Sequence, residues 1–262
     1  MEIISLENDK EKQKLSFVLK NSNHAFANAL RRIMKDEVPA MAIEDVEFRK
    51  NSSILYDEMI AHRLGLTPLT TDLKSYNLTE ECKCEGKGCA RCQLKMTLKA
   101  RGPAMVYASE IKSKDPAVKP VYPKMPIVKL LKGQVLELEA TAVLGKGKEH
   151  MKWSPAHVYY TYLTKVSVTH NQEKFEQFAD KYPPQIFGKD GKIDRNLINT
   201  PALIDACEGI CDDLVKVERD KNSFVFYVES WGQLEPKKIV LEASDILEKK
   251  LDSVVELVKK LK

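Results

Sequence analysis

Alternating apolar and polar residues along the chain predict a series of β-strands. Leu15, Phe17 and Leu19 occupy every second position, which is the period of a strand with one buried face. The charged turn 8–13 separates them from an apolar run at 3–6, so the pattern predicts an N-terminal hairpin. The predicted strands are 3–6, 15–20, 42–48, 93–100, 134–143, 159–170 and 223–229.

Apolar residues three and four positions apart predict helices between these strands. The first helix follows the capping candidates at 21–23 and ends before Val38-Pro39, because a residue before proline disfavours helical geometry. Its apolar positions are Phe26, Leu30, Ile33 and Met34. Further helices are predicted at 56–65, 174–182 and 201–215, and from about residue 244 to the C-terminal end.

The predicted terminal helix carries a single apolar stripe over about five turns, with lysines on its opposite side. The stripe consists of Ala243, Ile246, Leu247, Leu251, Val254, Val255, Val258 and Leu261. An apolar surface of this length must be covered, either by the chain's own sheet or by a partner. The pattern alone leaves both possibilities open.

The composition narrows the class of protein. Of 262 residues, 43% are hydrophobic and 31% are charged, which is enough apolar material for a buried core. The net charge of +4 argues against a nucleic-acid-binding surface over the whole protein. No apolar run approaches the ~20 residues that span a bilayer, and the first residues do not resemble a signal peptide. We therefore expect a cytoplasmic protein, in which the six cysteines serve metal or redox chemistry rather than a disulfide framework.

Four of the cysteines fall within eleven residues and predict a metal site. They are Cys82, Cys84, Cys89 and Cys92. The two-residue gap between Cys89 and Cys92 allows both sulfurs to bind one tetrahedral ion, and four thiolates leave no open coordination position. We therefore expect a structural zinc ion, with an iron–sulfur cluster as the alternative. Cys207 and Cys211 would share one face of a helix, and we interpret them as small core residues.

Motifs for catalysis are missing from the sequence. It contains no phosphate-binding glycine loop, no dinucleotide fingerprint and no nucleophile elbow. Among the histidines, only His62 lies in a dense polar group, together with Asp57, Glu58 and Arg63. Such a group could serve acid–base chemistry, but we interpret it as a salt-bridged helix turn. We predict no catalytic residues in this chain.

Several motifs together resemble the alpha-like assembly subunits of RNA polymerase. The resemblance starts in the helix Phe26-Ala-Asn-Ala-Leu-Arg-Arg-Ile33 and Glu37-Val-Pro39, and continues in Ala42-Ile-Glu-Asp-Val46. It extends through Glu58-Met-Ile-Ala-His-Arg-Leu-Gly-Leu-Thr-Pro-Leu69 to the terminal helix, and so spans nearly the whole chain. Length and layout are most similar to the archaeal branch of this family. The counterparts of that branch are the third-largest subunit of eukaryotic polymerase II and bacterial alpha.

The resemblance implies an α+β fold in three parts. A discontinuous dimerisation domain, a sheet plus two helices, would comprise 1–47 and 216–262. A mostly β domain with the zinc loop would be inserted at 48–170. A small third region derived from a ferredoxin-like domain would occupy 171–215. Some archaeal relatives hold an iron–sulfur cluster there, but this region contains only Cys207 and Cys211. The resemblance therefore implies a degenerate domain without a cluster, with a disulfide between these two cysteines as a possibility.

The resemblance also implies a scaffold function and its partners. The chain would pair with the small alpha-like subunit L, and then recruit subunit N and the second-largest subunit, while the largest subunit holds the catalytic magnesium. DNA would be contacted only indirectly, through the complex. The implied core or partner-binding residues are Phe26, Leu30, Ile33, Met34, Ile246, Leu247, Leu251, Val254, Val258 and Leu261. On this view Leu30→Asp or Val254→Asp would abolish partner binding. The four cysteines match the zinc loop of the eukaryotic relatives.

Two other functions remain as alternatives. A zinc-bearing nucleic-acid-binding module is disfavoured by the small net charge and by the lack of aromatic residues near the basic loop Lys146-Gly-Lys148. A thiol or metal enzyme is disfavoured by the closed set of four thiolates. Both alternatives predict a well-behaved monomer, whereas an assembly subunit should aggregate until its partner covers it.

Overall fold

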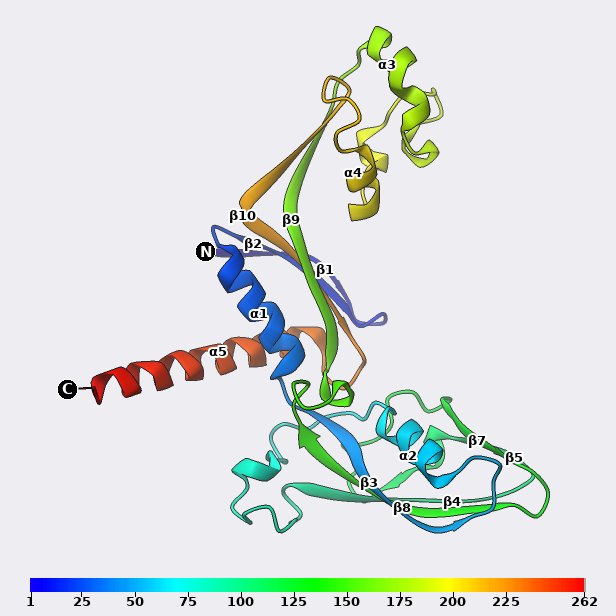
Figure 1. Cartoon of the computed structure of the whole chain (residues 1–262). Helices are drawn as coiled ribbons and strands as arrows, with labels where there is room; N and C mark the ends of the chain where they lie inside the picture. Colours follow the sequence, from blue (N-terminus) through cyan, green and yellow to red (C-terminus); the bar gives the residue numbers. More distant parts are fainter. Residues whose placement is uncertain (262) are drawn as a thin grey trace. The chain divides into compact units, whose positions relative to one another are not determined.

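The computed structural model describes residues 1–261 and combines α-helices with several antiparallel sheets (Figure 1). The helices are α1 (His24–Asp36), α2 (Asp57–Gly65), α3 (Gln172–Phe178), α4 (Pro201–Cys207) and α5 (Pro236–Lys259). The strands are β1 (Glu2–Asp9), β2 (Lys14–Lys20), β3 (Ala40–Asn51), β4 (Gln93–Arg101), β5 (Ala104–Tyr107), β6 (Lys112–Ser113), β7 (Pro126–Leu130), β8 (Val135–Gly145), β9 (Ala156–Val168) and β10 (Val215–Ser230). No helix within residues 1–261 is long and apolar enough to cross a membrane. The expected mixture of helices and sheets is confirmed.

Within residues 1–261 the strands form three sheets, and this part of the chain divides into two compact units. The strand orders are β1-β2-β10-β9, β3-β8-β4-β6 and β5-β7. The first unit consists of Met1–Ile4, Val18–His24 and Tyr160–Val225. The second consists of Ser5–Phe17, Ala25–Tyr159 and the residues from Phe226 onward. The boundaries of the three predicted domains remain a prediction.

The sheet β3-β8-β4-β6 has a buried face and a charged face. Along β4, Leu94, Met96 and Leu98 are buried at every second position, as the strand period requires. They join a core to which α2 contributes Ile60 and Leu64. This core supports the loops between the strands of the sheet.

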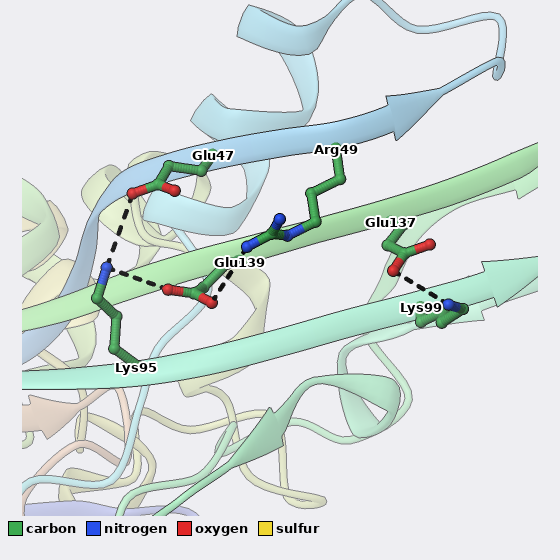
Figure 2. Close-up of polar contacts among 6 residues, drawn as sticks. All are labelled: Glu47, Arg49, Lys95, Lys99, Glu137 and Glu139. Atoms are coloured by element: carbon green, nitrogen blue, oxygen red, sulfur yellow. Dashed lines mark hydrogen bonds and ion pairs between the residues drawn. The ribbon is translucent and has the colours of Figure 1, made fainter.

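The opposite face carries ion pairs across three strands (Figure 2). Glu47 on β3 lies directly opposite Glu139 on β8, a pairing of like charges that destabilises a sheet by itself. Lys95 on β4 lies between them, with its Nζ 3.2 Å from a carboxylate oxygen of Glu139 and 3.8 Å from one of Glu47. Lys99 and Glu137 form a simple pair at 3.0 Å. Lys95 therefore compensates a repulsion that the register imposes.

Lys95→Met should lower the free energy of unfolding by about 0.5–1 kcal/mol, because two opposed carboxylates lose their shared cation. Urea denaturation of the two proteins measures this difference. Lys99→Met is the matched control and should cost less, since the carboxylate that it leaves, Glu137, lies opposite Lys50 on β3 rather than opposite another carboxylate. An equal loss in both variants would contradict the bridging role of Lys95.

The start of helix α5 is fixed to β3 and to the segments around Thr71 and Lys152 through Gln233. This buried side chain donates from Nε2 to the carbonyl oxygens of Met41, at 3.3 Å, and Lys152, at 3.2 Å. Its own carbonyl accepts the Thr71 N–H at 2.9 Å. The preceding Gly232 has φ +87°, and a Cβ there would lie 2.4 Å from Cγ1 of Val121. Glycine is therefore required at position 232, and the hydrogen bonds of Gln233 fix the conformation of the turn. This conformation sets where α5 begins.

Gln233→Ala should lower the free energy of unfolding by about 1–3 kcal/mol, since one buried and one partly buried carbonyl group lose a donor. Thermal unfolding monitored by circular dichroism measures the loss. Gln172→Ala, at an exposed position on α3, serves as the control and should leave the melting temperature unchanged. A Gln233→Ala protein as stable as wild type would show that the turn is held by its backbone contacts alone.

Two predicted helices differ from the structure in their bounds, and two strands were not predicted. The helix predicted at 201–215 ends at Cys207, because Gly209 takes φ +74° and β10 already begins at Val215. The terminal helix begins at Pro236 rather than near 244, since proline fits the first helical turn, where its missing N–H is not needed. Strands β5 and β7 were not predicted, because prolines around them indicate loops.

Candidate functional site

The first half of α5 packs against its own unit, and the second half does not. Ile239 and Ala243 are completely buried, and Ile246 and Leu247 are partly buried. Lys250 then forms an ion pair with Glu37, just after α1. From residue 251 to 261 every position is exposed, and the end of the helix extends beyond the neighbouring elements of its unit (Figure 1).

The exposed half of α5 presents one continuous apolar face. Its large side chains are Leu251, Val254, Val255, Leu257 and Val258, and Leu261 follows just after the helix; all six are between 50% and 83% exposed. At about 100° per residue they fall within an arc of roughly 160°. Lysines, acidic residues and Ser253 occupy the rest of the circumference. Fully burying one such side chain contributes about 1.5–3 kcal/mol, so this face is a strong docking element once a partner covers it.

The residues of α1 were expected either in the core or at a partner interface. Leu30, Ile33 and Met34 are buried in the core of the chain itself, and Phe26 is partly buried. Of the predicted residues on α5, Leu251, Val254, Val258 and Leu261 are exposed. Sequence reasoning missed Leu257. Its position three residues after Val254 and four before Leu261 was the signal that could have found it.

The four cysteines of the predicted metal site come together between the 3-10 turn Thr79–Glu81 and β4. All four Sγ atoms lie within 4.8 Å of one another. The Sγ separations are 3.5 Å for Cys82 and Cys89, and 3.5 Å for Cys84 and Cys92. A tetrahedral ion with bonds of ~2.3 Å requires sulfur separations of about 3.8 Å. The residues therefore fit a four-thiolate metal site.

The backbone of this loop is shaped for the same arrangement. Gly86 has φ +77° and Gly88 has φ +79°, which lets the chain reverse between the two cysteine pairs. The Cys89 N–H donates to Sγ of Cys92 at 3.2 Å, and the Cys92 N–H donates to the carbonyl of Cys89 at 3.0 Å. A metal held here would cross-link the loop onto the start of β4.

The thiols differ in acidity. The hydrogen bond from Cys82 lowers the pKa of Cys84 to about 6, whereas burial raises the pKa of Cys92 to about 12. Cys84 is therefore the more acidic of these two thiols, and Cys92 must lose its proton when a metal binds. Metal affinity should accordingly fall as the pH is lowered.

The other two cysteines do not form a comparable site. Cys207 is buried in a small core with Tyr182 and Ile186, and Cys211 packs partly against that core. Because α4 ends at Cys207, the expectation that both cysteines share a helical face is wrong. Tyr182 donates its hydroxyl to the Cys211 carbonyl at 3.3 Å, and burial raises its pKa to about 12. Cys207 thus takes the core role that the sequence indicated.

The polar group around His62 has structural contacts. Arg63 donates from Nε to the Ile127 carbonyl at 2.8 Å and from Nη2 to that of Pro126 at 2.6 Å, which ties α2 to β7. Asp57 accepts from Asn51 Nδ2 at 2.7 Å. Arg63 thus binds backbone carbonyls rather than the acidic residues of its own turn. The interpretation of this group as a salt-bridged helix turn is therefore wrong for Arg63 and Asp57.

Comparisons with known proteins identify relatives of the whole chain. Residues 43–158 match the RNA polymerase Rpb3/RpoA insert domain. The chain is similar to the protein named DNA-directed RNA polymerase subunit Rpo3 from Methanosarcina acetivorans, with 39% identity over 251 residues and 94% of each chain covered. The Rpo3 of Thermococcus kodakarensis is 38% identical over 256 residues, covering 97% of this chain and 96% of the relative. That of Methanosphaera stadtmanae is 35% identical over 261 residues, covering 95% and 96%.

Proposed function

Because this chain belongs to the Rpb3/RpoA family of DNA-directed RNA polymerase subunits, we propose that it is a non-catalytic assembly subunit that pairs with a small alpha-like subunit, subunit L. The observation that carries the proposal is the apolar face of α5 between Leu251 and Leu261. If the chain functioned as a monomer, this face would stay exposed to water and would lower the solubility of the protein.

The buried and exposed halves of α5 have distinct roles in this proposal. The Gln233 turn and the buried Ile239 and Ala243 hold the helix in a defined direction. The exposed half is then presented as a rigid element, so that little conformational entropy is lost when the partner binds. Leu30, Ile33 and Met34 support the neighbouring core instead of touching the partner.

We also propose that the four-cysteine site holds a structural zinc ion. The ion would be bound by Cys82, Cys84, Cys89 and Cys92, and would supply a cross-link without catalytic chemistry. The thiol separations support four-coordinate binding. Subunit N and the second-largest polymerase subunit would join the pair after it forms, and the whole would act in the cytoplasm.

Co-expression tests the pairing directly. The chain and the small alpha-like subunit of the same organism should elute together as a one-to-one complex in size-exclusion chromatography. The chain alone should form concentration-dependent aggregates. A lone chain that stays monomeric, together with no binding to the small subunit, would overturn the proposal.

A further inference from the structure

The strands β5 and β7 form a two-stranded sheet with one buried and one exposed face (Figure 1). Val106 and Val128 lie opposite each other and are buried in the core. Met105 lies opposite Lys129, and both are exposed. Tyr107, two positions after Met105, is exposed as well. The core therefore fixes a backbone that presents these side chains to solvent.

The exposed face continues into the loop before β7. The Ser109 N–H donates to the Pro123 carbonyl at 3.0 Å, which holds the two neighbours of Pro123, Tyr122 and Lys124. Tyr107 precedes Ser109 by two residues, so about 7 Å of strand and one strand spacing separate it from this loop. Tyr107 and Tyr122 are 40% and 48% exposed, and neither ring packs on another aromatic ring within residues 1–261. We call this surface the β5 patch; it consists of Met105, Tyr107, Tyr122, Lys124 and Lys129.

The segment that runs through the β5 patch is strongly basic. Residues 112–132 contain six lysines and a single acidic residue, Asp115. All six lysines are exposed, and none of them forms an ion pair in the part of the chain that the structure describes. Asp115 accepts the hydroxyl of Tyr76 at 2.7 Å. Positive charge that is nearly balanced over the whole chain is therefore concentrated in this segment.

The elements packed against the β5 patch leave it cationic. Glu110 accepts a backbone N–H of the patch at 3.0 Å, and β4 ends in the exposed Arg101. On α2, Arg63 donates to two backbone carbonyls at the start of β7. The acidic residues of α2, Asp57 and Glu58, lie in its first turn, about one and a half turns from Arg63. The group of α2 that contacts β7 is thus a cation.

Exposed lysines beside unstacked tyrosine rings suit a polyanion that carries aromatic faces. Ammonium groups attract phosphates, and a tyrosine ring stacks on an unpaired base. An acidic peptide would satisfy the lysines but would leave the rings without a partner. A duplex keeps its bases stacked on one another, away from the tyrosines. Single-stranded nucleic acid satisfies both features, and DNA-directed RNA polymerases, the family of this chain, act on nucleic acids.

We propose that the β5 patch binds single-stranded nucleic acid, with bases stacked on Tyr107 and Tyr122 and phosphates paired with Lys124 and Lys129. An RNA transcript and an unpaired DNA strand share this chemistry. The proposal goes beyond the assembly role and does not depend on pairing with the small subunit. No single stretch of sequence carries this surface, because the register of β5 and β7 brings two segments together.

Fluorescence anisotropy tests the binding. The full chain, alone and in complex with the small subunit, is titrated against labelled oligouridylate or oligodeoxythymidylate of about 12 nucleotides in about 0.15 M salt. We expect saturable binding of single strands and at least tenfold weaker binding of a duplex of equal length. Tighter binding of RNA would identify the transcript as the ligand, and tighter binding of DNA an unpaired DNA strand. Absence of binding, equal binding of the duplex, or equal competition by polyglutamate would overturn the proposal.

The tyrosines are tested by removing their rings. The double variant Tyr107→Ala, Tyr122→Ala should weaken binding of single strands at least tenfold, because two stacking contacts are lost. Its melting temperature should equal that of wild type, since both side chains are exposed. The double variant Tyr107→Phe, Tyr122→Phe keeps the rings and should bind as wild type does. Unchanged binding of the alanine variant would overturn the proposal.

The lysines are tested by the salt dependence of binding. The double variant Lys124→Gln, Lys129→Gln should reduce the slope of log affinity against log salt by about 1.4, the value for two phosphate contacts on a single strand. The control Lys10→Gln, Lys189→Gln removes the same charge at exposed positions outside the β5 patch and should leave the slope unchanged. Equal changes in the two variants would show general attraction to a basic protein and would overturn the site.

Cross-linking places the test in the complete polymerase. The photoreactive amino acid p-benzoylphenylalanine replaces Tyr107, and the transcribing enzyme is irradiated and analysed by mass spectrometry. We expect a cross-link to RNA or to a DNA strand. A cross-link to another protein subunit would show that the β5 patch is a subunit contact and would overturn the proposal. A chain that binds single strands but never pairs with the small subunit would overturn only the proposed function.

Discussion

Val254→Asp is expected to weaken binding of the small alpha-like subunit at least a hundredfold and to leave the melting temperature of the lone chain unchanged. Val254 is 56% exposed at the centre of the apolar face of α5, so aspartate is well solvated there until a partner binds. In the complex the carboxylate would be buried without a partner, which costs about 3 kcal/mol or more, equal to a hundredfold in affinity. Isothermal titration calorimetry measures the loss.

Ser253→Asp is the matched control for this prediction. It places the same charge one residue earlier, outside the arc of the apolar face of α5 and among exposed residues. Its affinity for the small subunit should stay within about threefold of wild type, the spread usual for surface changes. Equal losses in both variants would indicate a general effect of negative charge on the helix rather than a buried apolar contact.

Leu30→Asp shows where sequence and structure lead to different expectations. Periodicity assigns Leu30 and Val254 equally to apolar helix faces, and both were expected to disable partner binding. In the structure Leu30 is only 4% exposed inside the core of the chain. Aspartate there should unfold the protein before any partner is involved, since a buried unpaired charge costs several kcal/mol. Circular dichroism of the lone chain would show this loss of structure.

The sequence predicted most elements because local pattern and local propensity agree there. The alternation in Leu94, Met96 and Leu98 and the three–four spacing in α1 each identify one buried face. The cysteine loop was also predictable, since spacing and glycines are local properties. What covers each face was not predictable, because it depends on residues far apart in sequence. Gln233, bonded to Met41 and Lys152, is an example that no local pattern reveals.

Cys84→Ser should reduce zinc affinity at least a hundredfold and release the loop 79–92, while the insert core stays folded. Four thiolates together supply about 10–16 kcal/mol of binding free energy in small zinc domains, so the loss of one ligand removes several kcal/mol. The core around Met96 and Leu98 does not include the cysteines, and so it should survive. Metal analysis and trypsin digestion measure the two effects, because Lys83, Lys87 and Arg91 lie in the loop.

Cys211→Ser provides the control, since it removes a thiol outside the cluster. This variant should retain about one zinc ion per chain and resist cleavage in the loop as wild type does. Treatment of the wild-type protein with a chelator should reproduce the cleavage pattern of Cys84→Ser, because both remove the same cross-link. If wild-type protein contains no zinc and its loop is cleaved equally fast with and without chelator, then the four thiols do not form a structural metal site.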